Sequence, residues 1–241
     1  MLVRKMFHRV ADAWIRHGPK QFVGLALKNV AALPKITVER LRRHPAEFDI
    51  NLGIDTDGAC SVGALDLDPR SESTRNATRY EATHISMFKR VLSSAPIDPR
   101  DFSFIDYGSG KGRVLILAAH FPFQKVIGIE LSPSLHKIAE ENIHRAAERT
   151  HLACTDVRSI CGDATQFNPP DGPLVCYLYN PFGSLIVQRV MDRLEQSLRV
   201  APRPIFILYV NPVHNEVIAA STCFQVVEQN SDFCTFRSTA P

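Results

Sequence analysis

The stretch Phe104-Ile105-Asp106-Tyr107-Gly108-Ser109-Gly110-Lys111-Gly112-Arg113 decides the fold of this 241-residue chain. Strand formers precede the glycines, and the apolar run from Val114 to Ala119 suits a helix that packs on a sheet. Three glycines at alternate positions let the backbone turn sharply and approach a ligand closely. Because the first N–H groups of the following helix are free, the stretch predicts a strand, a ligand-binding turn and a helix.

Two other kinds of glycine loop do not fit this stretch. A phosphate-binding P-loop requires Gly, four residues and then Gly-Lys-Ser/Thr, but Ile105 stands five positions before Gly110, and Gly112 follows Lys111. The dinucleotide fingerprint requires a third glycine where Arg113 stands. A dinucleotide-dependent Rossmann enzyme is therefore disfavoured, while a glycine-rich turn that binds nothing stays open as the structural alternative.

What remains, Asp-x-Gly-x-Gly-x-Gly-Arg, resembles motif I of the class I S-adenosylmethionine (SAM) dependent methyltransferases. The resemblance covers roughly residues 80–241 and implies SAM as the cofactor, with the glycine turn under its methionine part. It also implies an α/β fold, a Rossmann-like doubly wound sheet of strand order 3-2-1-4-5-7-6 with strand 7 antiparallel. The cofactor-binding residues that it assigns in this stretch are Asp106, Gly108, Ser109, Gly110, Gly112 and Arg113.

An acidic residue closes the second predicted strand, residues 125–131. Glu130 lies 20 positions after Gly110, and a carboxylate there can accept hydrogens from both hydroxyls of a ribose. We assign Glu130 and the adjacent Leu131 to the cofactor site. The alternative is an acidic side chain placed only for the N-terminus of the next helix, which Ser132 is expected to cap.

The third predicted strand, residues 157–161, is followed by Gly162-Asp163-Ala164. In the resembling family a short acidic segment at this point lies beside the adenine ring, which implies that Asp163 and Ala164 bind the cofactor. A plain turn is the alternative, because Gly and Asp are common turn residues.

The fourth predicted strand, residues 174–179, runs into Asn180-Pro181-Phe182-Gly183. The family places its motif IV here, and the pattern resembles the Asn-Pro-Pro-Tyr of methyltransferases that act on amino groups. The resemblance implies that Asn180, Pro181 and Tyr179 orient the target nitrogen, with Asn180 also near the cofactor. Phe182 and Gly183 depart from that pattern and leave the target open. A Pro-punctuated strand exit is the alternative.

A second Asn-Pro pair follows the fifth predicted strand, residues 204–210. We expect Asn211 to reach the same pocket as Asn180, and His214 to lie at its rim as a possible proton acceptor. The sequence after residue 223 predicts a closing antiparallel hairpin.

Residues 1–45 are predicted to form a basic amphipathic helical extension, since they hold ten basic and only two acidic residues. Such an arm suits an acidic partner, an anionic membrane surface or RNA, and it also resembles an organelle transit peptide. The plain alternative is a solvated helical arm.

Residues 46–100 are predicted to connect this arm to the SAM-binding domain, residues 101–241, through a loop with a short strand or hairpin and then a helix. Asp49 is interpreted as a turn residue. The run Tyr80-Glu81-Ala82-Thr83 resembles the loop before motif I in Dot1-like lysine methyltransferases, which implies that Tyr80 and Thr83 contact the cofactor. Alternatively, Thr83 caps the following helix.

The composition, 45% hydrophobic and 22% charged, is that of a globular protein, and no apolar run is long enough to span a bilayer. The scattered cysteines predict buried free thiols, a cytoplasmic location and no metal site.

These features predict a SAM-dependent methyltransferase that acts on a nitrogen of a macromolecule, with a protein favoured over a nucleic acid as acceptor. A non-catalytic SAM- or RNA-binding module that uses the basic arm is the alternative.

Overall fold

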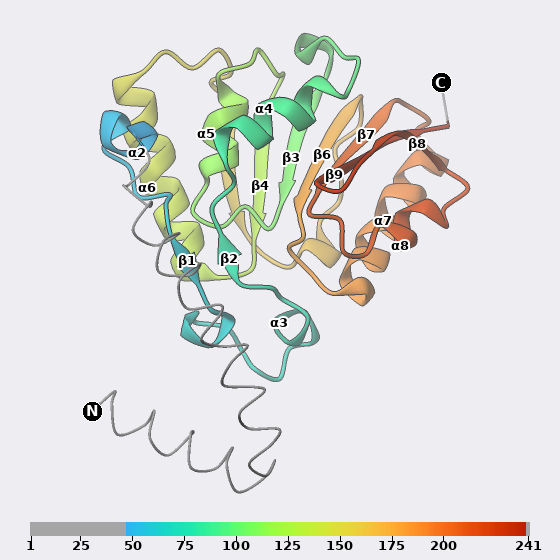
Figure 1. The fold of residues 1–241 in the computed structure, drawn as a ribbon, viewed down its shortest axis with the longest axis horizontal. Helices are drawn as coiled ribbons and strands as arrows, with labels where there is room; N and C mark the ends of the chain where they lie inside the picture. The colour runs from blue at the N-terminus through green and yellow to red at the C-terminus, as the bar shows by residue number, and fades with distance from the viewer. Residues whose placement is uncertain (1–46, 240–241) are drawn as a thin grey trace, which may run out of the picture. The chain divides into compact units, whose positions relative to one another are not determined.

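Seven strands of the chain form one mixed sheet, seen in the middle of Figure 1. The computed structural model describes residues 47–239, so the predicted extension over residues 1–45 lies outside the described residues. The strand order is β5-β4-β3-β6-β7-β9-β8, which is the predicted order 3-2-1-4-5-7-6. Strand β9 runs antiparallel to both of its neighbours, also as predicted. The strands are β3 (Ser103–Tyr107), β4 (Val126–Glu130), β5 (Val157–Cys161), β6 (Leu174–Tyr179), β7 (Ile205–Val210), β8 (Phe224–Gln229) and β9 (Phe233–Ser238).

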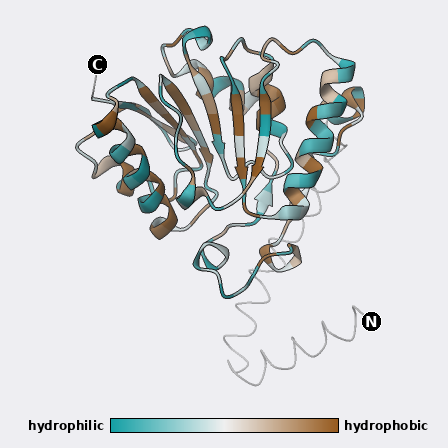
Figure 2. Cartoon of the chain, turned by 180° about the vertical axis from the view of Figure 1, so that it is seen from behind, coloured by the Kyte–Doolittle hydropathy of each residue, from teal (hydrophilic) through white to brown (hydrophobic). Residues whose placement is uncertain are grey.

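Helices cover both faces of this sheet, because its central strands are apolar on both sides. Along β6, Cys176 and Leu178 pack under one set of helices while Val175 and Tyr177 pack under the other. In Figure 2 the strands are accordingly mostly hydrophobic, and the outer faces of the helices are mostly hydrophilic. One face carries α4 (Ile85–Ser93), α5 (Arg113–Ala119) and α6 (Pro133–Arg149), and the other α7 (Ser184–Val200) and α8 (Asn215–Ala219).

Residues 47–83, which come before α4, contain two short strands and three short helices. Strands β1 (Ala59–Cys60) and β2 (Tyr80–Glu81) pair antiparallel, so short strands occur here as expected, but residues 61–79 separate them and they do not form a tight hairpin. The helices are α2 (Glu47–Leu52), the 3-10 helix η1 (Val62–Ala64) and α3 (Glu72–Arg75). The interpretation of Asp49 as a turn residue was wrong, because Asp49 lies within α2 and is buried there.

Two further local predictions need correction, while one helix cap is confirmed. Ser132 caps α6, its hydroxyl accepting the N–H of Leu135 at 3.3 Å. Thr83 caps no helix: the N-cap position of α4 is His84, and the Thr83 hydroxyl lies 3.3 Å from that of Tyr177. Cys161 is exposed and not buried, because β5 is an edge strand of the sheet.

Candidate functional site

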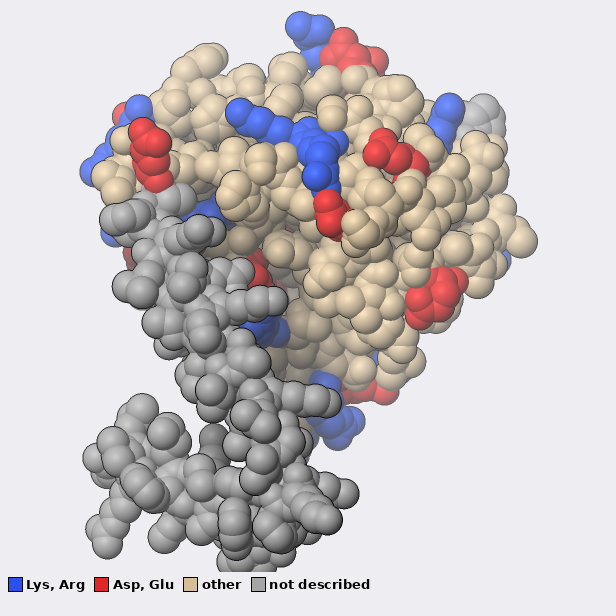
Figure 3. Space-filling model, viewed as in Figure 1, with Lys and Arg blue, Asp and Glu red and all other residues tan. Residues whose placement is uncertain are grey.

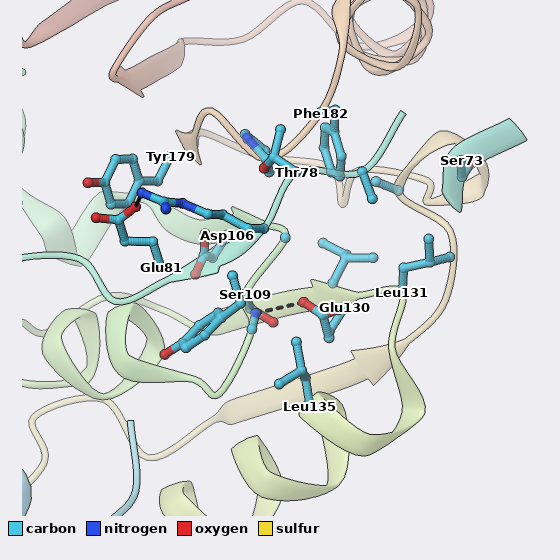
Figure 4. A pocket seen from close by; sticks show the side chains of 18 of the residues that line it. Ser73, Thr78, Glu81, Asp106, Ser109, Glu130, Leu131, Leu135, Tyr179 and Phe182 are labelled. Carbon is cyan, nitrogen blue, oxygen red and sulfur yellow. Dashed lines mark hydrogen bonds and ion pairs between the residues drawn. The ribbon is translucent and has the colours of Figure 1, made fainter. Parts of the chain in front are cut away.

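The carboxyl ends of four neighbouring strands surround one cavity of about 890 Å³, its open mouth included. This is the expected place for a ligand in an open parallel sheet. Asp106 of β3, Glu130 of β4, Asp163 after β5 and Tyr179 of β6 line it. The cavity closes on its other side through residues 65–83, and Figure 4 shows Ser73 and Thr78 of that segment beside Phe182. We call residues 49–83 the cover segment.

The glycine turn between β3 and α5 has a left-handed backbone conformation, which glycine adopts without strain. Gly108, Gly110 and Gly112 have φ angles of 84°, 53° and 83°. A Cβ on Gly110 would stand 2.2 Å from Cε2 of Tyr80, and one on Gly108 would stand 2.6 Å from Cβ of Pro181. Side chains at these positions would therefore collide with the opposite wall of the cavity. Gly112 occupies the N-cap position of α5, away from the cavity lining.

Glu130 joins the end of β4 to the glycine turn. Its Oε2 accepts the N–H of Gly110 at 2.7 Å, and its Oε1 accepts the N–H of Ser132 at 2.8 Å. Burial raises the pKa of Glu130, although these backbone hydrogen bonds act in the opposite direction. Each carboxylate oxygen retains acceptor capacity toward the cavity, which the adjacent Leu131 also lines.

Asp106 lies beside Glu130 on the neighbouring strand. Burial, and then the charge of Glu130, raise the pKa of Asp106 well above its usual value. Ser109 also lines the cavity, but its hydroxyl is packed toward Gly128, where a Cβ would stand 2.6 Å away. Among the described residues that hydroxyl has no hydrogen-bond partner.

Asp163 is fixed from two sides. Its Oδ2 accepts the Ser73 hydroxyl at 2.6 Å, and its Oδ1 accepts the N–H and the hydroxyl of Thr165, both at 2.8 Å. Burial acts to raise the pKa of Asp163, but these hydrogen bonds prevail and hold it below its usual range. Ala164 follows and lines the cavity.

The loop after β6 brings Tyr179, Pro181 and Phe182 to the cavity, while Asn180 lies behind its lining. Asn180 has a left-handed φ of 40°, a conformation that asparagine tolerates better than most residues. Its side-chain Oδ1 is buried, and no hydrogen-bond partner for it exists among residues 47–239. The backbone carbonyls of Asn180 and Pro181 already accept the hydroxyl and the N–H of Thr78.

Asn211 and His214 do not reach this cavity, contrary to expectation. Both follow β7, one strand further from the glycine turn. The N–H of Asn211 is bound by the carbonyl of Asp232, and the N–H of His214 points to the hydroxyl of Tyr209 at 3.3 Å.

Arg113 is buried and its guanidinium is directed into the cover segment. It donates to Asp49 at 3.1 Å, to the hydroxyl of Thr56 at 2.7 Å and to the carbonyl of Thr83 at 3.4 Å. The hydroxyl of Tyr80 donates to the carbonyl of Thr56 at 2.5 Å. Arg113 therefore borders the cavity while its charge is used to hold Tyr80 and Thr83 in place.

Sequence reasoning missed four residues of this site: Asp49, Thr56, Ser73 and Thr78. Each makes its bond to a residue 57 to 102 positions away, apart from the local contacts of Asp49 with Thr56 and Asp57. No periodicity or motif in the sequence marks such contacts.

Comparison with known proteins agrees with this architecture. The family described as "Histone methylation protein DOT1" matches residues 70–168. A predicted N6-adenine-specific DNA methylase from Listeria monocytogenes is similar in structure, with a TM-score of 0.50 at 14% identity over 66% of this chain and 52% of that chain. An RNA methyltransferase from Salinibacter ruber, in complex with S-adenosyl-L-homocysteine, has a TM-score of 0.47 at 20% identity, over 66% of this chain and 93% of that one.

No curated protein sequence matches this chain. The family match spans less than half of the chain, and the structural likeness bears on the fold. The strand order and the glycine turn after β3 agree with the Rossmann-like fold of SAM-dependent methyltransferases, and residues 70–168 are similar to the Dot1 family.

Proposed function

We propose that this protein transfers a methyl group from SAM to a nitrogen atom of a protein or another macromolecule. The observation that carries the proposal is one cavity bordered by the glycine turn, by Glu130 and by the loop of Asn180. The sulfonium of SAM supplies an activated methyl group, so the protein has only to bind and orient the two reactants.

The residues around the cavity fit this cofactor. Gly108 and Gly110 let the turn pack directly against Pro181 and Tyr80, and a Cβ at either position would displace these walls of the proposed cofactor site. Glu130 offers acceptor capacity for the two ribose hydroxyls, and Asp163 offers it for the exocyclic amine of adenine. Tyr80 and Thr83 of the cover segment complete the wall opposite the turn.

Asn180 is the proposed partner of the target nitrogen. Its Oδ1 is a buried acceptor without a donor among the described residues. A buried acceptor without a hydrogen bond destabilises the protein, so binding of a substrate that supplies a donor is favoured. An amine N–H meets that need, and the hydrogen bond directs the nitrogen lone pair toward the methyl group. Tyr179 and Pro181 form the adjoining wall. A charged amine has to lose a proton before it can attack.

A protein is the favoured acceptor because the matching family is described by histone methylation. The similar structures named above include an RNA and a DNA methylase, so a nucleic acid is the competing acceptor. A non-catalytic SAM- or RNA-binding module is the remaining alternative, and the buried Asn180 acceptor, which has no donor among residues 47–239, weighs against it.

Residues 1–45 are proposed to bind an acidic partner or an anionic membrane surface, since their basic excess is large. On the face drawn in Figure 3, basic and acidic side chains of the described residues are interspersed. No described helix is both long and apolar enough to cross a membrane. A cytoplasmic location stays a prediction.

The test is incubation of the purified protein with methyl-labelled SAM and whole-cell extract, followed by separate protease and nuclease treatment. Label released by protease supports a protein acceptor, and label released by nuclease transfers the proposal to a nucleic acid. Three matched proteins are compared: the full chain, Asn180→Ala and a chain that lacks residues 1–45. Binding of SAM without any transfer of label would contradict the enzymatic function.

A further inference from the structure

A stretch of the cover segment runs antiparallel to the loop that follows β6. Ala77 and Phe182 form an isolated bridge, and the N–H of Gly183 donates to the carbonyl of Asn76 at 2.7 Å. Thr78 donates twice, its N–H to the carbonyl of Pro181 at 3.2 Å and its hydroxyl to the carbonyl of Asn180 at 2.7 Å. Two segments 102 positions apart in sequence are thus joined at the loop of Asn180.

Thr78 itself is held by an anchored support. Glu72 at the start of α3 forms an ion pair with Arg189 of α7 at 2.6 Å. Ser73 donates to Asp163 on the cofactor side of the cavity. Since α3 is fixed to two other elements, the short stretch that follows it has little freedom to shift.

The Thr78 hydroxyl acts where the backbone is under strain. Asn180 has a φ of 40° and is followed by a proline, a combination that costs energy and persists only when the surroundings enforce it. The hydrogen bond to its carbonyl fixes the plane of the Asn180–Pro181 peptide. This peptide directly follows the Cα that carries the Asn180 side chain, whose buried Oδ1 has no hydrogen-bond partner within the described part of the chain.

We infer that Thr78 is a positioning residue for methyl transfer, because its hydroxyl holds the Asn180 peptide between Tyr179 and Pro181, which line the cavity where the target nitrogen is proposed to bind. The inference rests on the proposed function. Thr78 lines the cavity and touches the loop on its acceptor side, whereas Glu130 and the glycine turn lie across the cavity (Figure 4). Its loss should therefore lower the rate of transfer and spare the affinity for SAM.

The test compares Thr78→Val with Thr78→Ser. Valine keeps the shape and the backbone N–H of Thr78 but removes the hydroxyl donor, whereas serine keeps that donor. Initial rates of label transfer from SAM into extract protein are measured at saturating SAM, and SAM affinity is measured by calorimetry. We expect Thr78→Val to lower the rate about 10- to 100-fold with SAM affinity within about threefold of wild type. Thr78→Ser should restore the rate to within about threefold.

Amide hydrogen exchange supplies a readout that does not depend on turnover. In Thr78→Val the N–H of Gly183 should exchange faster, and in Thr78→Ser it should not. A wild-type rate in Thr78→Val, a matching loss of SAM affinity, or failure of serine to restore the rate would each overturn the inference. If wild type transfers no methyl group, the proposed function fails. The exchange rate of the Gly183 N–H then tests Thr78 independently of methyl transfer. An unchanged rate in Thr78→Val would show that the Thr78 hydroxyl does not hold the loop of Asn180.

Discussion

Replacing Glu130 with glutamine removes one of the two carboxylate acceptors that link the end of β4 to the glycine turn and to the start of α6. The carboxylate accepts the N–H of Gly110 through Oε2 and the N–H of Ser132 through Oε1, at 2.7 and 2.8 Å. A glutamine side chain has one acceptor oxygen and one donor group. In Glu130→Gln, one of these two backbone N–H groups therefore faces another donor inside a buried site.

The loss of one hydrogen-bond acceptor sets the expected change in stability and in SAM affinity. A buried donor left without an acceptor costs about 1–3 kcal/mol. For a domain of this size each kcal/mol lowers the midpoint of thermal unfolding by about 2–4 °C, which gives a total of about 2–12 °C. Loss of the charged acceptor for a ribose hydroxyl costs the complex with SAM about 1.5–3 kcal/mol. At 1.4 kcal/mol for each factor of ten, the dissociation constant rises about 10- to 150-fold.

Calorimetric titration with SAM and thermal unfolding of the ligand-free protein measure the two effects separately. Glu148→Gln is the matched control, because Glu148 is 60% exposed and its ion pair is with an exposed histidine of the same helix. We expect the control to change neither quantity by more than about 0.5 kcal/mol. A less stable Glu130→Gln with wild-type SAM affinity would refute the proposed binding of the ribose by Glu130. Unchanged stability would refute the claim that Glu130 accepts both backbone N–H groups.

Three further predictions follow from the geometry. Gly110→Val should abolish SAM binding, because the position has positive φ and faces an aromatic ring; calorimetry beside unchanged circular dichroism tests this, and tight binding contradicts it. Asp49→Ala removes the nearer carboxylate of the buried Arg113, which keeps only Asp57 at 3.5 Å as an ion-pair partner, and should cost about 3–5 kcal/mol in urea unfolding. The exposed pair of Asp68 is the control, and Asp68→Ala should cost about 0–1 kcal/mol. The raised pKa of Asp106 means that the native state binds its proton more tightly than the unfolded state. Stability should therefore fall as the pH rises above about 4, and the fall should be shallower in Asp106→Asn; equal slopes in urea unfolding would contradict the assigned burial.

The sheet and the residues at its strand ends could be predicted because their signals are local. Apolar runs mark the central strands, and glycines with a regular spacing mark the turn after β3. Glu130, Asp163 and Tyr179 end up together because the carboxyl ends of parallel strands share one edge of the sheet. The same reasoning placed Asn211 at this pocket, but Asn211 does not reach it, because β7 lies one strand further from the glycine turn.

Apart from Tyr80 and Thr83, the site residues of the cover segment could not be predicted, because their contacts are specified by tertiary packing. Asp49 reads as a turn residue in isolation, yet it lies in a helix where it accepts the N–H of Thr56 and pairs with Arg113. Thr78 has no neighbouring residue that hints at a partner 102 positions away. Polar residues of this kind contribute through hydrogen bonds to residues far away in the sequence, and such bonds leave no sequence pattern.

Under the proposed function, the two ends of the cover segment are expected to serve different reactants. At Asp49 and Thr56 it is fixed to Arg113, beneath the turn expected to hold the cofactor. At Thr78 it is fixed to the loop of Asn180, on the side where the target nitrogen is expected. A substitution that only loosened the segment as a whole would weaken SAM binding and methyl transfer together. Loss of SAM affinity from Asp49→Ala, set against loss of rate alone from Thr78→Val, would therefore mean that the segment positions the two reactants through separate contacts.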